Sequence, residues 1–382
     1  MKHVTLFLLF IAAAARADFR EFTQLPVDPS IDLALRRTAD ATLKAFPKLT
    51  AENLALTVID VTKPDVVSRA DYHGDAPFYP ASVIKLFFMT EVYHQHKEND
   101  PDVPRALKEM IGVSDNDATA FLLDTISDTC SGPELEGRAL RKFIDKRRVV
   151  NRYFNPMGYD ISAMAKPWSF GPFGRDVQLM GGPDRPNRNR ATSNSVASLI
   201  LWIVRRRAVS PTASDAMLAL MQRELKMTGT EEDQVTSFIG EALPAGTKLW
   251  SKAGWTSEVR HDAALVELPG GRRLIMVILT RGTADDKTLL PAITKTLLGE
   301  LSGAQAILPA PSGEDLLPAV EKRRHDCLRH TELPSPPRVC DQPCANRVFA
   351  NVLRLLHQVL ARTDDAIVSS AMGTATDCPS ED

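Results

Sequence analysis

YPASVIKLFF, residues 79–88, places a serine hydroxyl and a lysine amine three positions apart at the start of an apolar run. In a helix this spacing brings Lys85 onto the same face as Ser82. A serine hydroxyl alone is a poor nucleophile, but a neutral amine within reach can accept its proton. The stretch therefore indicates an activated serine, although a helix start with a solvated lysine would have the same sequence.

Two further motifs follow in the chain, Ser114-Asp115-Asn116 and Lys252-Ala253-Gly254. Each short match is unremarkable alone, whereas the ordered set of three is rare at average composition. With these motifs the chain resembles the penicillin-recognising serine acyl-transferases, that is, class A β-lactamases and the related DD-peptidases and penicillin-binding proteins. The resemblance covers about residues 28–305 and includes the segments 189–192 and 259–264.

The resemblance implies a role for each motif residue. Ser82 would be the nucleophile and Lys85 its base, while Ser114 would pass the proton to the departing nitrogen and Lys252 would bind the substrate carboxylate. Asn116 would hold the substrate amide and orient Lys85, and Asp115 would have a structural role. The oxyanion would be bound by backbone N–H groups of Ser82 and of Trp255, which follows Gly254.

The chain departs from the family pattern at the lysine motif. Ala253 stands where family members usually carry Thr or Ser, so a hydroxyl for the substrate carboxylate is lost. Arg260 and His261 are then candidates to bind that carboxylate beside Lys252. For His261 a second interpretation remains open, in which the imidazole pairs with Asp262 to hold a turn.

A second departure concerns release of the acyl group. Class A β-lactamases use a loop glutamate to activate the deacylating water, but residues 137–223 contain no glutamate. Asp160, Asp176 and Asp184 are the loop carboxylates that could replace it. The short spacing from Ser82 to Ser114, about half that of class A enzymes, further predicts a rebuilt helical lobe.

The hydrophobic pattern predicts an α/β (α+β) fold in which an antiparallel sheet is flanked by helices and carries an inserted all-helical lobe, at about residues 100–210. The active site would lie between the two lobes. Helices are expected at 28–46, 82–96, 213–225 and 286–301, and strands at 54–61, 66–72, 248–252, 263–268 and 273–280. A long loop is expected at 155–189.

Both ends of the chain differ from this domain at 18–305. Residues 1–17 combine a basic start, a short apolar core and an Ala-Arg-Ala ending, which predicts a secretory signal cleaved after Ala17 and a periplasmic or secreted protein. Residues 306–382 form a Pro/Cys-rich extension with one amphipathic helix expected at 347–362, packed in a core or bound to a membrane or partner. No stretch is suited to a stable membrane span.

Cysteines are concentrated in the extension. Cys130 lies in the main domain, and the others are Cys327, Cys340, Cys344 and Cys378. Export would permit disulfides among the four, in any of three pairings, whereas their spacing matches no common zinc pattern. No metal or cofactor is indicated, and a net charge of -2 argues against nucleic acid as a partner.

The sequence thus favours an exported serine hydrolase that opens β-lactam amides through an acyl-enzyme on Ser82. Two alternatives remain open. The protein could be a DD-peptidase or another cell-wall amidase acting on a peptidoglycan-like substrate, for which no loop glutamate is required. It could also be a slowly deacylating penicillin-binding sensor.

Overall fold

The computed structural model describes residues 18–167, 172–182 and 184–303. The predicted signal peptide and the predicted extension at 306–382, with its expected helix and its four cysteines, lie outside the described residues. Cys130 is exposed and, within the described part of the chain, is a free thiol.

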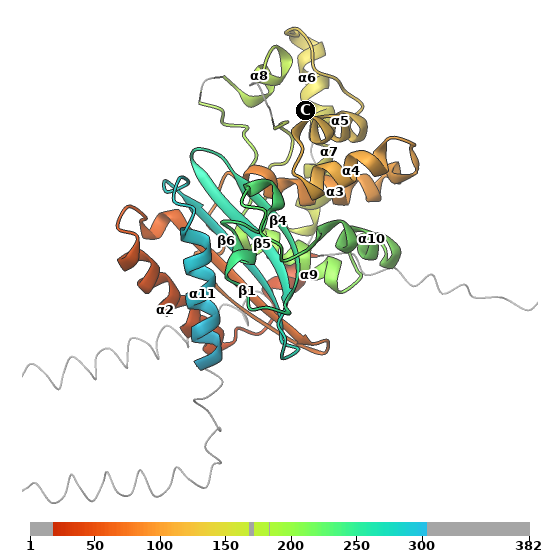
Figure 1. Cartoon of the computed structure of the whole chain (residues 1–382). Coiled ribbons are helices and arrows are strands. Elements are labelled where there is room, and N and C mark those ends of the chain that lie inside the picture. Colours follow the sequence, from red (N-terminus) through yellow and green to blue (C-terminus); the bar gives the residue numbers. More distant parts are fainter. Residues whose placement is uncertain (1–17, 168–171, 183, 304–382) are drawn as a thin grey trace, which may run out of the picture. The chain divides into compact units, whose positions relative to one another are not determined.

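An antiparallel sheet of six strands in the order β2-β1-β6-β5-β4-β3 forms the centre of the domain (Figure 1). The strands are β1 Leu54–Lys63, β2 Val66–Tyr72, β3 Gln222–Arg223, β4 Lys248–Trp255, β5 Val259–Glu267 and β6 Arg273–Arg281. The helices outside the helical lobe are α1 Phe19–Thr23, α2 Pro29–Ala45, α9 Ser193–Val204, α10 Pro211–Met221 and α11 Leu289–Gly303.

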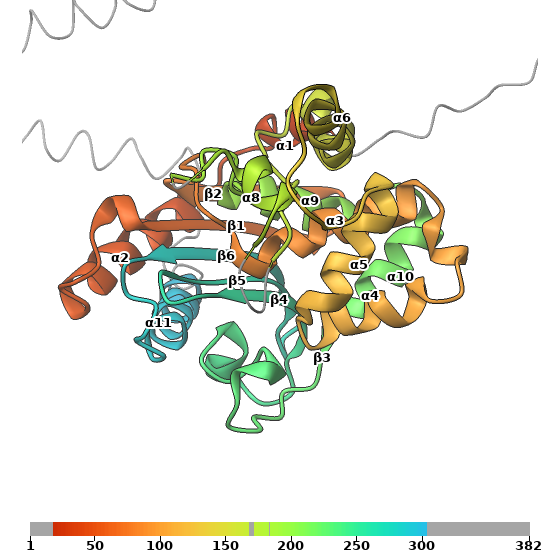
Figure 2. The same cartoon turned by 90° about the horizontal axis from the view of Figure 1, so that it is seen from above.

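Alternation along the strands divides the core between two faces. Leu56 of β1 and Met276 of β6 belong to the cluster that α2 and α11 cover, whereas Ile275 and Val277 belong to the cluster that includes α9. Successive strand side chains point to opposite faces, so both faces of the sheet can bury apolar residues. Figures 1 and 2 show α2 and α11 on one side of the sheet and α9 on the other.

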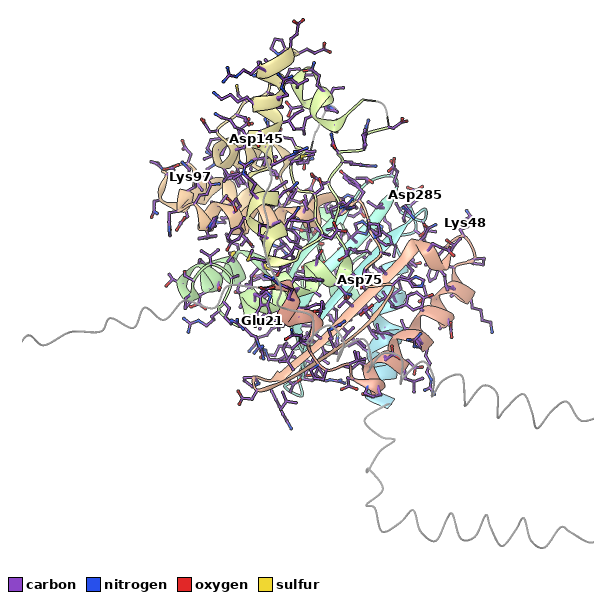
Figure 3. The ribbon with its side chains drawn as sticks, turned by 180° about the vertical axis from the view of Figure 1, so that it is seen from behind. Glu21, Lys48, Asp75, Lys97, Asp145 and Asp285 are labelled. Atoms are coloured by element: carbon purple, nitrogen blue, oxygen red, sulfur yellow. The ribbon has the colours of Figure 1, made fainter. Side chains whose placement is uncertain are left out.

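The helical lobe is inserted between β2 and β3. Its helices are α3 Lys85–His94, α4 Val103–Gly112, α5 Asn116–Ser127, α6 Gly137–Arg147, α7 Val149–Phe154 and α8 Arg175–Met180. Seen from behind, Lys97 and Asp145 lie on this lobe, and Lys48 lies at the end of α2 (Figure 3). The predicted α+β architecture with an inserted helical lobe is confirmed.

Several predicted boundaries were wrong by a few residues. The helix expected to reach residue 225 ends at Met221, because Gln222 and Arg223 pair with Trp250 and Leu249 of β4. Strand β5 begins at Val259, four residues earlier than expected, since its polar residues are buried in the sheet. Ser82 lies in a 3₁₀ turn, Ala81–Ile84, and the α-helix proper starts at Lys85.

Candidate active site

Three chain segments meet at the start of α3 and bring Ser82, Ser114 and Lys252 together. Non-glycine residues in the left-handed backbone region lie at or next to two of these segments, Ala81 at φ 45° and Ser114 at φ 60°, and a third, Gln234 at φ 53°, contacts Lys252 from a separate loop. Such residues cost of order 1–3 kcal/mol each and persist only where surrounding contacts hold them. Their gathering at one place is typical of a functional site.

Lys85 is fully buried, and the Ser114 loop surrounds its amine. The Nζ atom donates to the Ser114 carbonyl oxygen at 2.6 Å, to Asn116 Oδ1 at 2.9 Å and to Ser114 Oγ at 3.2 Å. Burial lowers the pKa of Lys85 to about 7, and the nearby charge of Asp115 opposes that shift. A substantial fraction of the amine is therefore neutral at neutral pH.

Ser114 Oγ also accepts a hydrogen bond from Lys252 Nζ at 2.9 Å, so one hydroxyl bridges the two lysines. Burial and the charge of Lys85 hold the pKa of Lys252 well below its usual value. Ser82 is half-buried, and its Oγ makes no hydrogen bond to any described residue. The amine of Lys85 thus forms its hydrogen bonds with the segment Ser114–Asn116 and not with Ser82.

Asp115 caps the helix that carries Asn116. Its Oδ1 accepts from the Ala118 N–H at 2.6 Å, at the N-terminus of α5. A carboxylate at this position satisfies an otherwise unpaired helix donor. The structural role expected for Asp115 agrees with this contact, and the cap fixes the direction in which Asn116 leaves the loop.

Gly254 allows β4 to approach the turn that holds Ser82. A Cβ built at Gly254 would lie 2.9 Å from the backbone nitrogens of Ser82 and Val83. Contacts this short with backbone atoms cannot be accommodated without movement, so only glycine permits the approach. Trp255 follows Gly254 in β4, so its N–H remains, with the N–H of Ser82, a candidate donor to an oxyanion.

Replacing Gly254 with alanine is expected to lower the rate of acylation by β-lactams about 10²–10³-fold, because the displaced strand separates the two oxyanion donors. The rate is measured by quenched-flow intact mass. Gly270→Ala is the matched control, since no atom lies within 4 Å of its added methyl group. An unchanged acylation rate in Gly254→Ala would show that acylation does not depend on the close approach of β4 to the Ser82 turn.

Gln234 is a site residue that the sequence analysis missed. Its buried Oε1 accepts from Lys252 Nζ at 2.6 Å and from the Ala253 N–H at 3.1 Å. Its Nε2 donates to the carbonyl oxygens of Ile111 and Gly112, just before the Ser114 loop. One side chain therefore ties the lysine strand to the serine loop. Apart from its polarity, no sequence signal marks it.

The free energy of unfolding of the Gln234→Leu variant is expected to be about 2–4 kcal/mol lower than that of the wild type, because the buried amine and backbone groups lose their partners. Urea denaturation followed by circular dichroism measures the difference. The exposed Gln222→Leu serves as the control. Equal stabilities of the two variants would contradict the bridging role.

Arg223 is a second connecting residue that the sequence analysis did not identify. Its guanidinium donates to the Ile111 oxygen at 2.6 Å, the Ser251 oxygen at 2.9 Å and the Gly112 oxygen at 3.2 Å. Burial lowers its pKa to about 10. Together with Gln234, it joins the end of α4 to β4, next to the Ser114 loop and the lysine motif.

Arg260 and His261, the candidates to bind the substrate carboxylate, are both buried and bonded to other protein groups. Arg260 is buried and forms an ion pair with Glu231, and its Nε donates to the Ala284 oxygen at 2.8 Å. Because adjacent strand residues face opposite sides, His261 points the other way from both Arg260 and Asp262. The expected pairing of His261 with Asp262 is therefore absent.

His261 instead supports the segment that leads to Ser82. Its Nε2 bonds the Tyr79 oxygen at 2.8 Å, and its Nδ1 accepts from the Thr280 N–H at 3.1 Å. Burial lowers the pKa of His261 to about 4, which keeps the ring neutral and its nitrogens in these two roles. Asp262 is also buried, which raises its pKa to about 6, and it accepts from the N–H groups of Ile239 and Ala263.

The three loop aspartates have other contacts or are exposed. Asp160 bonds Arg190 at 2.6 Å near the surface, and Asp184 is exposed. Asp176 is buried in α8 and pairs with Arg147 of α6 at 3.3 Å. These contacts position Asp160 and Asp176 for holding the loop, and no described hydrogen bond joins any of the three to Ser82 or Lys85.

Residues 97–301 match the family model described as the β-lactamase enzyme family. This match spans more than half of the 382 residues. The chain belongs to the β-lactamase enzyme family. As a family member with the serine and lysine motifs in one site, it is a serine β-lactamase-like hydrolase. No match was found among curated proteins.

Solved structures share the fold of this β-lactamase family member. A β-lactamase from Sphaerobacter thermophilus aligns with a TM-score of 0.51 and 20% identity, covering 71% of this chain and 98% of its own. A mutant of PBP-A, in an acyl-enzyme complex with penicillin G, aligns with a TM-score of 0.53 and 18% identity, over 73% and 100% of the two chains. A class A β-lactamase from Bacteroides cellulosilyticus gives 0.51 and 18%, over 72% and 100%.

Proposed function

We propose that the protein is an exported serine hydrolase that β-lactams acylate at Ser82 and that releases the acyl group slowly. The observation that carries the proposal is the Ser114 hydroxyl, which lies within hydrogen-bond distance of both Lys85 Nζ and Lys252 Nζ. This arrangement supplies a proton path from the nucleophile side of the site to the leaving-group side. Opening a β-lactam amide requires such a path.

In the proposed reaction the Ser82 oxygen attacks the β-lactam carbonyl carbon and gives its proton to neutral Lys85. The negative oxygen that forms is held by the N–H groups of Ser82 and Trp255. Ser114 then donates its proton to the ring nitrogen as the carbon–nitrogen bond breaks, and it regains a proton from Lys85. The product is an ester on Ser82, and the amine of Lys85 returns to its neutral form.

Substrate recognition is assigned to three groups. Lys252 is assigned to the substrate carboxylate, and Asn116 offers its amide N–H to the acyl side chain while its Oδ1 holds Lys85. Ala253 contributes only backbone to this arrangement. We therefore expect the substrate carboxylate to bind more weakly than in relatives that have a hydroxyl at the position of Ala253.

Slow release follows from the missing carboxylate. Ester hydrolysis needs a base that activates water, but Asp160 and Asp176 are paired with arginines and Asp184 is exposed. The missing carboxylate also favours a second candidate function, a DD-peptidase or other cell-wall amidase acting on a peptidoglycan-like substrate. There the acyl group would pass to an amine of a second substrate or to water. A penicillin-binding sensor would also form a long-lived ester on Ser82.

Intact-mass spectrometry during reaction with a chromogenic cephalosporin distinguishes these functions. A persistent adduct with hydrolysis slower than about one turnover per minute supports the proposal, since an uncatalysed acyl-enzyme would turn over this slowly or slower. Rapid turnover without an adduct would make the protein an efficient β-lactamase. Absence of both adduct and hydrolysis would refute the proposal for β-lactams and leave the amidase to be tested on peptide substrates.

Export is the part of the proposal that rests on residues 1–17. Expression in a Gram-negative host should give a periplasmic protein whose first residue is Asp18, as cleavage after Ala17 predicts. Edman sequencing of the purified protein identifies that residue. A cytoplasmic product that retains Met1 would rule out the signal peptide.

A further inference from the structure

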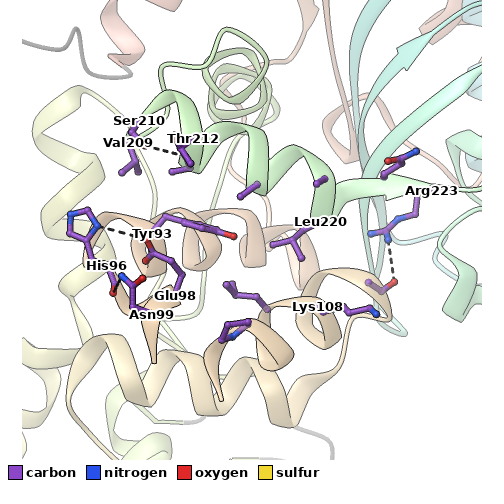
Figure 4. Close-up of a pocket in the computed structure, with 17 residues that line it drawn as sticks. Tyr93, His96, Glu98, Asn99, Lys108, Val209, Ser210, Thr212, Leu220 and Arg223 are labelled. Carbon is purple, nitrogen blue, oxygen red and sulfur yellow. Dashed lines mark hydrogen bonds and ion pairs between the residues drawn. The ribbon is translucent and has the colours of Figure 1, made fainter. Parts of the chain in front are cut away.

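A cavity of about 820 Å³ opens between α3, α4 and α10, outside the catalytic site (Figure 4). Tyr93 of α3, Leu107 of α4 and Leu220 of α10 line its middle, together with the small side chains of Ala213, Ala216 and Ala219. The cavity ends at Lys108, Gly112 and Arg223 on one side and at His96, Glu98 and Asn99 on the other. A mostly apolar cavity with a few polar groups is the usual form of a small-molecule site.

Tyr93 gives the cavity a hydroxyl that has no hydrogen-bond partner among the described residues. Only 8% of this residue is exposed, and its ring crosses the cavity with the hydroxyl pointing away from the protein backbone toward Leu220 (Figure 4). The hydroxyl makes no hydrogen bond to any described residue, and burial raises its pKa, so that it stays a proton donor. The hydroxyl faces the cavity, where a bound ligand could supply the acceptor that no described residue provides.

The end of the cavity beyond Tyr93 is cationic. Lys108 is exposed and forms no ion pair with any described residue, and the Arg223 guanidinium lies beside Gly112 at the same end (Figure 4). At the opposite end, Glu98 and His96 lie 3.8 Å apart, and they attract each other when the ring is protonated. A ligand that complements this cavity would therefore have an anionic group at the Lys108 end and an apolar part in the middle of the cavity.

The cationic end adjoins the catalytic machinery. Arg223 lines the cavity and donates to the oxygens of Gly112 and Ser251, which precede Ser114 by two residues and Lys252 by one. An anion bound there would attract the guanidinium away from those carbonyl oxygens. The same contacts hold the Ser114 loop against β4, so their loss would change the spacing between Ser114 and Lys252.

We propose that this cavity binds an amphipathic carboxylate, a medium-chain aliphatic acid being the simplest example, and that the bound ligand slows acylation of Ser82. The carboxylate accepts from Tyr93 and pairs with Lys108, while the chain lies between Leu107 and Leu220. The binding site stands independently of catalysis, whereas the effect on acylation rests on the function proposed above.

Calorimetric titration of the full-length protein with decanoate tests the binding site, and the Ser82→Ala variant serves as a second host that is independent of acylation. Saturable binding to both proteins is expected, with decanol at least about tenfold weaker because it lacks the charge. Absence of saturable decanoate binding would refute the site. Equal binding of decanol would refute the anionic ligand class.

Two variants locate the ligand. Ala216→Trp fills the cavity and should abolish decanoate binding, whereas Ala292→Trp, at a similarly half-buried position of α11, should not. Tyr93→Phe removes only the hydroxyl and should weaken binding about tenfold without loss of folding. Unchanged affinity in both Ala216→Trp and Tyr93→Phe would place decanoate elsewhere and overturn the proposal.

The effect on catalysis is measured as the acylation rate with and without saturating decanoate. A decrease of at least about fivefold is expected in the wild type, the lower range of ordinary coupling between sites. The decrease should disappear in Ala216→Trp. Binding with an unchanged acylation rate would refute the regulatory role, while failure of acylation without ligand would refute the proposed function and not the binding site.

Discussion

Replacing Ser82 with alanine is expected to abolish the covalent adduct with β-lactams and to reduce any hydrolysis to the background rate. The variant retains Lys85, Ser114 and Lys252 but has no oxygen at which an ester could form. The measurement is the intact mass after a one-hour incubation with penicillin. The mass of the variant should remain that of the free protein.

The control for this variant is Ser210→Ala, which removes a helix-capping hydroxyl at α10 far along the chain. That change should lower stability by about 1 kcal/mol and leave adduct formation intact. An adduct on Ser82→Ala would locate the nucleophile elsewhere and contradict the proposed mechanism. Peptide mapping of the wild-type adduct must, in addition, place the acyl group on the peptide that contains residue 82.

The sequence alone was enough to predict the architecture because its signals are local or strongly periodic. Strands β1 and β2 pair across a short turn as expected, and the apolar run after Ser82 forms α3, which starts three residues later than predicted. The motif residues Ser82, Ser114 and Lys252 are also recognisable from short patterns. These features depend on neighbours in the chain, which a single sequence displays.

Contacts between distant segments could not be predicted in the same way. Gln234 bonds Gly112, which lies 122 positions away, and it does so from a left-handed backbone conformation that a non-glycine residue adopts only when tertiary contacts hold it. Strand β3 has two residues and no periodicity of its own. Arg223 was assigned to a helix for that reason, and its connecting role was hidden.

The protein contacts of Arg260 and His261 were not foreseen for a different reason. Both follow the lysine motif closely, which suggested a shared position in the cleft. Recognising that β5 starts at Val259 would have placed the two side chains on opposite faces of the sheet. Their polarity in a fully buried strand concealed that start. His261 contributes indirectly, since its bond to Tyr79 supports the segment before Ser82.

Lys85→Met is expected to lower the acylation rate about 10³-fold, within the range that a positioned general base contributes. The long apolar side chain of methionine occupies a similar volume, so that the loss reports on the amine rather than on a cavity. Rates are measured by quenching the reaction with acid and determining the acylated fraction by mass. Lys142→Met, at an exposed position of α6, should react at the wild-type rate.

The pH dependence identifies the protonation state that Lys85 needs. Only a neutral amine can accept the Ser82 proton, and burial lowers the pKa of Lys85 to about 7. The wild-type acylation rate should therefore rise with pH, reach half its maximum near pH 7 and level off above it. In Lys85→Met this rise should be absent, and a rise that persists near pH 7 would assign the titration to another group.

Asp262 is the group that could be mistaken for Lys85, because burial raises its pKa to about 6 and it titrates in an overlapping range. Its deprotonation adds a negative charge near Lys252 and Arg223, whereas deprotonation of Lys85 removes a positive charge beside Ser114. Asp262→Asn keeps an oxygen acceptor but cannot titrate. If Lys85 is the base, this variant retains the half-maximal rate near pH 7, and a shift or loss of the rise would make Asp262 the controlling group.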